Sequence, residues 1–388
     1  MPTSYRMPVA ERVGRCLSPG LNGDRRRLAS PDQLDLSGDG VVQSVPPHVI
    51  QAAKDALDAG ETHYTSRTGV PALRAAVAAD VNARHGLDLG AEDVVITSGG
   101  LEATFAALWI GLANEDGARL VCADPNSPAI AQLACLAGAD VRRFSTNPDD
   151  GFLVRADAVR DALAGGARML MLSSPDAVTG VSLPVDELAG IADLAEEHDP
   201  IVVLNEAGVR CTYPSRPPTS LRDAPSLTNR TVIVGSFSRD YRLAGWRVGY
   251  FAARGEVFAR MRSLKVALSI CSTAVSQFAA LAAITGPQDW IEAQRDEFAQ
   301  RRAAFTASLE RAHIRVVPAD AFPYVWVDLR PFGLDEPAAL SRLAAAGITP
   351  RGGSEFGRAG AGCLRFTLAL PPDDLAAAGA RVAAALAG

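Results

Sequence analysis

Lysine is scarce in this chain of 388 residues. Lysine and arginine together number 38, but Lys54 and Lys265 are the only lysines. The six cysteines form no CxxC pair and stand mostly in apolar segments, so the sequence predicts neither a disulfide framework nor a metal site such as zinc. Long apolar runs are also missing, and residues 1–27 lack the apolar core of a signal peptide. We therefore expect a cytoplasmic protein without a membrane span.

An excess of charge of one sign is absent as well. The 38 basic and 44 acidic residues are spread along the chain and give a net charge of -6. Residues 25–27 form the only basic cluster, which is typical of a solvated surface. This balance offers no electrostatic footprint for nucleic acid or for an anionic membrane, so we expect neither as a partner.

Short, apolar, β-branched segments are abundant and end in small or polar residues. They cover residues 94–98, 120–123, 141–145, 169–173, 201–205, 232–236 and 248–252. Helical spacing lies between them, at residues 101–113, 127–137, 156–164 and 185–198. The alternation predicts an α/β fold, with a mainly parallel, doubly wound sheet and helices on both of its faces. Its ligand crevice should lie at the carboxyl ends of the strands.

The last hundred residues follow a different pattern. Residues 289–312 read as a long, charged amphipathic helix, and the strand-like segments 322–329 and 364–370 and an alanine-rich helix come after it. The sequence thus predicts a large domain over residues 46–285. A smaller α+β domain would combine an N-terminal arm, residues 1–45, with residues 286–388.

Two segments carry a specific resemblance. Residues 97–103 read T-S-G-G-L-E-A, a glycine-rich turn between a strand and a helix, whose backbone N–H groups suit an anion. Residues 236–250 read S-F-S-R-D-Y-R-L-A-G-W-R-V-G-Y. The second segment resembles the cofactor-lysine motif of the class I/II aminotransferases, the pyridoxal phosphate (PLP) enzymes of fold type I. Arg239 stands where that family has its lysine.

Other segments resemble the family in the same order along the chain. Residues 64–74 are similar to "Y-x-x-x-x-G-x-x-x-L-R", residues 174–180 to "N-P-x-N-P-T-G", and residues 204–208 to a strand end "D-E-x-Y". Weaker landmarks extend from residues 36–40 to 364–367. The resemblance implies a fold-type I aminotransferase fold with a seven-stranded sheet. It also implies a homodimer with a shared active site, in which Tyr64 reaches the phosphate site of the neighbouring subunit.

Both anion-binding ends of the family's site are present. The resemblance assigns the phosphate end to two backbone donors, two hydroxyls and one guanidinium, from Gly100, Leu101, Ser236, Ser238 and Arg247. It assigns the substrate's α-carboxylate to Arg365 and the backbone of Gly38.

The residues that serve the cofactor ring differ from the family pattern. A guanidinium, with a pKa above about 12, can neither form an imine nor move a proton at neutral pH, so Arg239 cannot replace the lysine. Asn205 replaces the aspartate that protonates the pyridine nitrogen, and Ser127 stands in place of a stacking aromatic residue. Ala177 and Gly208 replace the asparagine and tyrosine that bind the ring oxygen. Lys54 and Lys265 are expected on solvated helix faces.

These changes favour an enzyme on the aminotransferase fold that works without a PLP Schiff base and needs no cofactor. We expect an isomerase, lyase, cyclase or group-transfer enzyme of natural-product metabolism, acting on an amino-acid-like carboxylate. Arg239 would stabilise an oxyanion. Proton transfer would fall to Glu206 or Tyr64, with His63 and Tyr241 as further candidates. The space left by the ring, beside Asn205, Ser127 and Ala177, would hold the substrate.

Two alternatives stay open. The chain could bind PLP or pyridoxamine phosphate (PMP) non-covalently, as an aminotransferase or a related enzyme, which the phosphate-binding residues favour and Asn205, Ala177 and Ser127 oppose. It could also be an inactive pseudoenzyme that serves as a ligand-binding or structural partner subunit.

Overall fold

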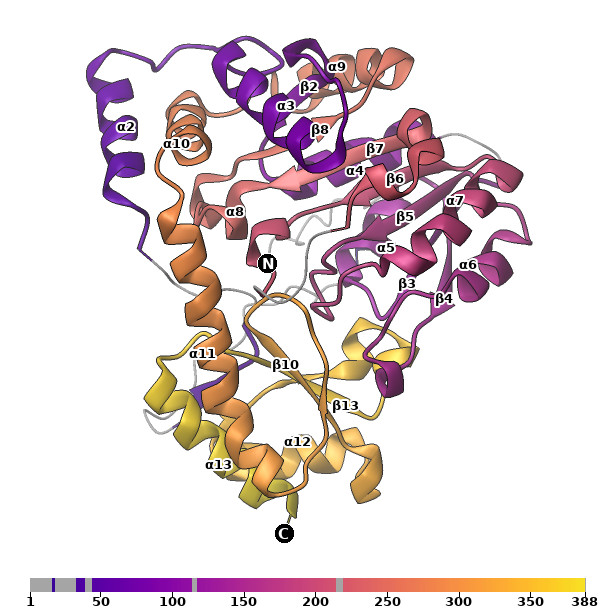
Figure 1. The fold of residues 1–388 in the computed structure, drawn as a ribbon, viewed down its shortest axis with the longest axis vertical. Helices are drawn as coiled ribbons and strands as arrows, with labels where there is room; N and C mark the ends of the chain where they lie inside the picture. The colour runs from indigo at the N-terminus through magenta and orange to yellow at the C-terminus, as the bar shows by residue number, and fades with distance from the viewer. Residues whose placement is uncertain (1–15, 18–32, 39–43, 114–116, 214–218, 388) are drawn as a thin grey trace, which may run out of the picture.

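A seven-stranded sheet organises the larger part of the chain (Figure 1). The structure is a computed structural model that describes residues 16–17, 33–38, 44–113, 117–213 and 219–387. Its strands are β2 (Val94–Thr97), β3 (Arg119–Asp124), β4 (Asp140–Ser145), β5 (Met169–Ser173), β6 (Ile201–Asn205), β7 (Thr231–Ser236) and β8 (Gly249–Ala252). They lie in the order β2-β8-β7-β6-β5-β3-β4, and only β8 runs antiparallel to its neighbours. All seven predicted strands are confirmed, with ends shifted by a few residues.

Helices cover both faces of this sheet. One face packs against α4 (Gly100–Leu112), α5 (Pro128–Leu136) and α9 (Gly255–Ser269). The other packs against α2 (Pro47–Asp58), α3 (Pro71–His85), α6 (Ala156–Leu163), α7 (Val185–His198) and α10 (Ala274–Thr285). The central strands are apolar on both sides, as β2 shows with four buried residues in succession, because two helical layers exclude water from them. The doubly wound architecture is confirmed.

A second, smaller sheet follows the long helix α11 (Asp289–Arg311) in the chain. In Figure 1, α11 runs from the level of α10 down along this part of the molecule. Its strands β9 (Val316–Val317), β10 (Tyr324–Asp328), β12 (Arg351–Gly352) and β13 (Cys363–Thr367) pair antiparallel in the order β12-β13-β10-β9. The helices α12 (Glu336–Ala345) and α13 (Pro372–Ala387) pack with it in a separate apolar core.

The N-terminal arm joins this smaller unit through β1 (Leu34–Asp35), which pairs with β11 (Ile348–Thr349). The strands of the smaller unit therefore fall within residues 1–45 and 286–388, the ranges predicted for the smaller domain. The domain division itself stays a prediction. The remaining helices are short: α8 (Phe237–Asp240) and the 3₁₀ turns η1 (Ala91–Asp93), η2 (Pro148–Asp150), η3 (Val209–Cys211), η4 (Leu221–Asp223), η5 (Pro225–Arg230), η6 (Ala244–Trp246), η7 (Arg330–Phe332), η8 (Gly353–Phe356) and η9 (Arg358–Gly360).

One expectation about cysteine is wrong. A disulfide joins Cys16 to Cys135 on α5, so an N-terminal residue is tied to the large sheet unit across 119 positions of sequence. No CxxC spacing announces such a pair, because the two cysteines meet only in the folded chain. The expected surface at residues 25–27 and the family landmark at residues 39–40 lie outside the described residues. Within the described residues, no helix is long and apolar enough to cross a membrane.

The expectation for Lys265 is also wrong. Lys54 is exposed, but the side chain of Lys265 has no exposed surface, and its Nζ lies 2.9 Å from Oε2 of Glu102 on α4. It also donates to Ser269 Oγ at 2.7 Å. Lys265 follows the buried Met261 by four residues and therefore shares its helix face, which points inward.

The two lysines provide a matched pair of variants. We expect Lys265→Met to lower the free energy of unfolding by about 3 kcal/mol, since it leaves Glu102 without its cation; the cost lies at the low end for a broken buried pair because Glu102 keeps some contact with water. Lys54→Met should change it by less than about 0.5 kcal/mol. Urea unfolding of both variants measures the difference, and equal values would contradict the buried ion pair.

Candidate active site

The phosphate-end residues predicted from the sequence lie together at the carboxyl end of β7 and the start of α4. Ser236 ends β7, and its hydroxyl accepts a hydrogen bond from the Ser238 backbone N–H at 3.2 Å as the cap of α8. Gly100 begins α4, and a Cβ on it would lie only 3.0 Å from the Cβ of Ser236. The end of β7 and the start of α4 therefore lie close together at Ser236 and Gly100.

Glycine is required at this turn. Gly99 has a φ of 85°, and a Cβ there would overlap the guanidinium of Arg247. A Cβ on Gly249 would overlap the backbone of Gly99 and Gly100. The sequence S-G-G thus lets the guanidinium approach the N-terminus of α4, where backbone N–H groups and the helix dipole attract an anion. Leu101, the next residue of α4, has a half-exposed side chain.

Arg247 is held in place without being neutralised. Its Nη1 donates to Ser238 Oγ at 3.3 Å and to the Ala244 carbonyl at 2.9 Å. The side chain is exposed, and no carboxylate in the described part of the chain lies within ion-pair distance. Its positive charge is therefore directed to a ligand next to Ser238 and Gly99.

Glu102 and Lys265 stabilise this turn through hydrogen bonds. The Ser98 backbone N–H donates to Glu102, and Lys265 and Ser269 bind the same carboxylate. Burial raises the pKa of Glu102, but the hydrogen bonds from Ser98 and Lys265 outweigh it and the pKa is lowered overall. A charged carboxylate is thus fixed behind the turn, and sequence reasoning missed this support.

The substrate-end residue Arg365 is buried in β13, with 2% of its surface exposed. Its guanidinium carbon lies 4.4 Å from the ring centres of both Tyr324 and Phe356, in cation-π contact with each. The Thr367 N–H donates to the Leu36 carbonyl at 2.8 Å, which brings the N-terminal arm with Gly38 next to this strand. The pairing of Arg365 with Gly38 stays a prediction.

Arg239 reaches towards this end. Its Nη2 donates to Tyr324 Oη at 2.9 Å, and its guanidinium carbon lies 5.3 Å from the ring centre of Phe322. Tyr324 therefore contacts Arg239 through its hydroxyl and Arg365 through its ring face. Periodicity does not reveal this link, because the link depends on the register of β10 against β13.

The positions that serve the ring oxygen in the family lie against aromatic side chains. A Cβ on Gly208 would overlap the ring of Phe322, and Ala177 packs against the cluster that contains Phe322 and Tyr324. Asn205 ends β6, and its Oδ1 accepts the Ala207 N–H at 3.0 Å. Ser127 precedes α5, and its side chain forms no capping hydrogen bond.

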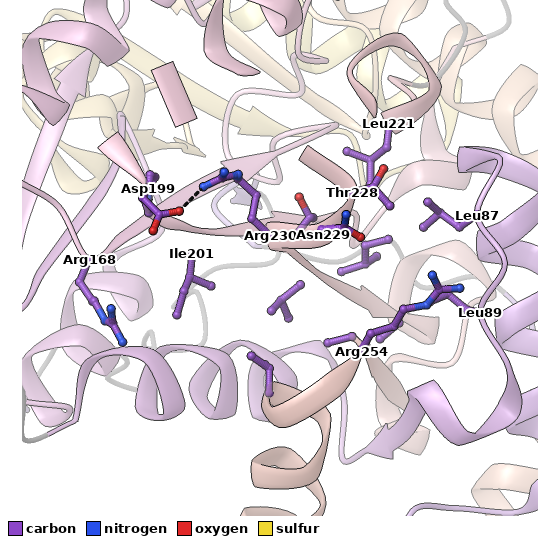
Figure 2. Close-up of a pocket in the computed structure, with 17 residues that line it drawn as sticks. Leu87, Leu89, Arg168, Asp199, Ile201, Leu221, Thr228, Asn229, Arg230 and Arg254 are labelled. Atoms are coloured by element: carbon purple, nitrogen blue, oxygen red, sulfur yellow. Dashed lines mark hydrogen bonds and ion pairs between the residues drawn. The ribbon is translucent and has the colours of Figure 1, made fainter. Parts of the chain in front are cut away.

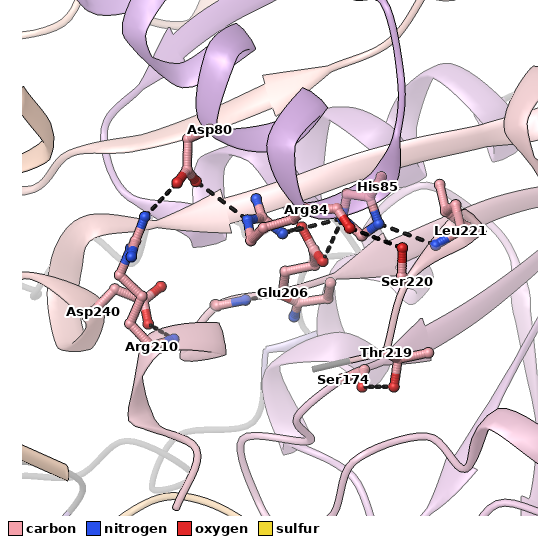
Figure 3. A network of polar contacts seen from close by, with 12 residues as sticks. Asp80, Arg84, His85, Ser174, Glu206, Arg210, Thr219, Ser220, Leu221 and Asp240 are labelled. Atoms are coloured by element: carbon pink, nitrogen blue, oxygen red, sulfur yellow. Dashed lines mark hydrogen bonds and ion pairs between the residues drawn. The ribbon is translucent and has the colours of Figure 1, made fainter. Parts of the chain in front are cut away.

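Glu206 does not have the predicted proton-transfer environment. Its carboxylate is buried and binds Arg84 Nη1 at 2.5 Å and His85 Nε2 at 2.7 Å (Figure 3). His85 Nδ1 accepts the Leu221 N–H at 3.1 Å, so its proton is on Nε2. Burial raises the pKa of Glu206, but Arg84 and His85 outweigh it and lower the pKa. The residue is a structural carboxylate, which corrects the sequence expectation.

The other proton-transfer candidates are either exposed to solvent or packed among aromatic rings. Tyr64 is 80% exposed, and its neighbour His63 is exposed as well. Tyr241 is buried, with its ring stacked on Phe237 at 4.9 Å between ring centres.

Comparisons with known proteins agree with this geometry. Residues 31–382 match aminotransferase class I and II. The chain belongs to this family. It is 30% identical over 334 residues to an aspartate/prephenate aminotransferase of Thermus thermophilus, covering 85% of each chain. It is also 30% identical over 342 residues to an arginine–pyruvate transaminase of Pseudomonas aeruginosa, covering 87% of this chain and 86% of that one.

Solved structures give the same result. The aspartate aminotransferase from Thermus thermophilus with maleate superposes with a TM-score of 0.85 at 27% identity, covering 91% of this chain and 92% of that one. The fold-type I aminotransferase fold is thereby established for this chain.

These comparisons overturn the main functional expectation. Relatives of this chain are named as ordinary aminotransferases, so cofactor-free isomerase, lyase, cyclase or group-transfer chemistry is wrong, and so is the assignment to natural-product metabolism. The expectation of no cofactor is also wrong, because the family and these relatives are PLP-dependent. The expectation gave too much weight to position 239 and too little to the residues of the phosphate end.

The residues present fit such a cofactor at its phosphate. Arg247 has no carboxylate partner among the described residues, its guanidinium contacts Ser238, and the glycine turn lets it lie against the N-terminus of α4, where Gly100 meets Ser236.

The Glu206 network generates a pH prediction. Since the folded pKa of Glu206 lies below its ordinary value of 4.5, its stabilisation is present above that value and is lost as the pH falls through the folded pKa. Glu206→Gln should lower the free energy of unfolding by about 3 kcal/mol at pH 7. The wild type should lose more stability than the variant as the pH falls below 4.5. Urea unfolding across that range provides the measurement.

Glu256→Gln is the control, because Glu256 pairs with Arg260 on the exposed surface of α9. Its effect should stay below about 0.5 kcal/mol at every pH. Parallel pH profiles for the wild type and Glu206→Gln would show that Glu206 carries no stabilising charge.

Proposed function

We propose that this protein is an aminotransferase that binds PLP or PMP without a covalent bond at position 239. The observation that carries the proposal is the phosphate end, where Arg247 faces the glycine turn and has no carboxylate partner in the described chain. An arginine left unneutralised beside a helix N-terminus suits a phosphate ester. The names of the relatives support amino-group transfer as the reaction.

The side chains divide into two binding ends in this proposal. Arg247, Ser236 and Ser238 hold the phosphate together with the backbone N–H groups of Gly100 and Leu101. Arg365, whose guanidinium contacts two aromatic rings, holds the α-carboxylate of the amino acid or oxo acid beside the Gly38 backbone. When bound, the cofactor supplies the amino-group carrier and the electron sink.

Arg239 has a different role from the family lysine. Its guanidinium stays charged at neutral pH, so it can bind a negatively charged oxygen. It cannot form an imine with the cofactor. The Tyr324 hydroxyl fixes one end of this guanidinium at 2.9 Å. Asn205 offers a neutral amide where a carboxylate is expected in the family, which weakens the electron sink. We expect slower turnover than a lysine-containing relative would show.

A homodimer is part of the proposal. Tyr64 is 80% exposed, and Leu101, Leu268 and Ile270 are further apolar side chains that one copy of the chain leaves exposed. In the family's shared site, Tyr64 would reach the phosphate end of the other copy. The predicted cytoplasmic location likewise stays a prediction.

The phosphate end is tested by Arg247→Ala. Equilibrium dialysis should show that the wild type binds PLP or PMP and that the variant binds about tenfold to a hundredfold more weakly, because a charge-assisted hydrogen bond is lost. Arg342→Ala removes an exposed arginine from α12 and serves as the control with unchanged affinity. Failure of the wild type to bind either compound at millimolar concentration would refute the proposal.

The position of the ring is tested by Arg239→Lys. After incubation with PLP and reduction with borohydride, the variant should carry one covalent cofactor group on residue 239, detected by peptide mass spectrometry. The wild type treated in the same way should release its cofactor on denaturation. A modified lysine in the wild type would contradict non-covalent binding, and an unmodified variant would show that the ring lies elsewhere.

A further inference from the structure

A second cavity lies at the opposite edge of the large sheet from the candidate active site. Its volume is about 290 Å³, and Figure 2 shows its lining residues. The lining includes the first residues of β6 and β7, Ile201 and Thr231, together with Ala252 at the end of the antiparallel β8. Asn205 and Ser236 stand at the other ends of β6 and β7, so the sheet separates the two sites.

The floor of this cavity is apolar. Leu87, Leu89, Ile201, Ile233 and Val257 contribute aliphatic side chains from four different parts of the fold. Its size is close to the lower limit of ordinary ligand pockets, roughly 300 Å³. Burial of an apolar ligand body against such a floor stabilises the complex, whereas a bare inorganic ion buries no apolar surface there.

The rim is positively charged. Arg168, Arg230 and Arg254 line it, and Asp199 is the one carboxylate among the lining residues. That carboxylate is already bound by Arg230, with Nη1 and Oδ1 2.6 Å apart. Arg254 lies 3.8 Å from Asp93, a long separation for an ion pair on an exposed side chain. The rim therefore has positive charge in excess of what its own carboxylates balance.

Arg168 is the rim residue best able to donate hydrogen bonds to an anion. Its side chain is exposed, and no carboxylate in the described residues lies within ion-pair distance of it. Its backbone is fixed on both sides, since Arg168 N–H donates to the Arg119 carbonyl and Ile201 N–H donates to the Arg168 carbonyl, both at 3.0 Å. Arg168 also lines a neighbouring open cavity that contains the partly exposed Trp109, so a ligand can reach it from solvent.

We propose that this cavity is a second ligand site, which binds a small organic carboxylate with an apolar body. Arg168 binds the carboxylate, and the body rests on Ile201 and Val257. A guanidinium binds a carboxylate through two parallel N–H···O bonds, whereas the apolar floor selects against small inorganic anions. The site requires no cofactor, so it is independent of the proposed aminotransferase activity.

Calorimetric titration of the full chain tests the chemistry of this ligand with three probes. Phenylacetate should bind with a submillimolar dissociation constant. Acetate, which lacks the apolar body, and phenylacetamide, which lacks the charge, should each bind at least tenfold more weakly. Equal affinity for phenylacetate and phenylacetamide would overturn the carboxylate assignment, and absence of binding for phenylacetate would overturn the site.

Variants then separate this site from the active site, where Arg365 could also attract a carboxylate. Arg168→Gln should weaken phenylacetate binding about tenfold, and Thr228→Trp, which adds bulk to the lining, should abolish it. Arg365→Ala and the surface control Arg342→Gln should leave this affinity unchanged. Loss of binding in Arg365→Ala with retention in Arg168→Gln would place the probe in the active site and refute the proposal.

Discussion

The burial of the parallel strands β5, β6 and β7 between two helical layers is the constraint on which both sites depend. Pairing in register, with Ser173 beside Asn205 and Asn205 beside Val234, aligns the strands so that they end at one edge of the sheet. Loops that carry Asp176, Glu206 and Ser238 must therefore emerge side by side. The starts of the same strands meet at the opposite edge, and the arginine-rimmed cavity lies there.

Charge balance decides how these loops are held. Glu206 is buried and is compensated by Arg84 and His85, and Lys265 is buried and is compensated by Glu102. Burial raises the pKa of Asp176, which lies within the electrostatic reach of Arg365, while hydrogen bonds from Thr179 and Val178 oppose that rise. Breaking one member of such a pair leaves a charge in a poorly solvated place. In contrast, Arg247 has no such partner in the described structure, and this difference separates a binding arginine from a structural one.

The sequence predicts the frame well and the fine packing poorly. Strand periodicity locates all seven large-sheet strands, because it is a local pattern. The residues of the phosphate end are assigned by the resemblance to the family. Lys265 and the Cys16–Cys135 bond escape prediction, since each needs a partner more than a hundred residues away. Glu206 is misread for the same reason, because its partners Arg84 and His85 come from α3. The Tyr324 link between Arg239 and Arg365 depends on strand register, which periodicity does not fix.

Arg239 and Gly208 are coupled by packing through the rings of Phe322 and Tyr324. Phe322 occupies the space next to Gly208, so a tyrosine at position 208 could not enter unless that ring moved. Phe322 and Tyr324 are in turn the rings that contact Arg239. A lysine at position 239 would lose the planar group that these rings and the Tyr324 hydroxyl bind. Arginine at 239, glycine at 208 and the aromatic pair therefore form one packed unit. This unit holds a positive charge and contains no amine.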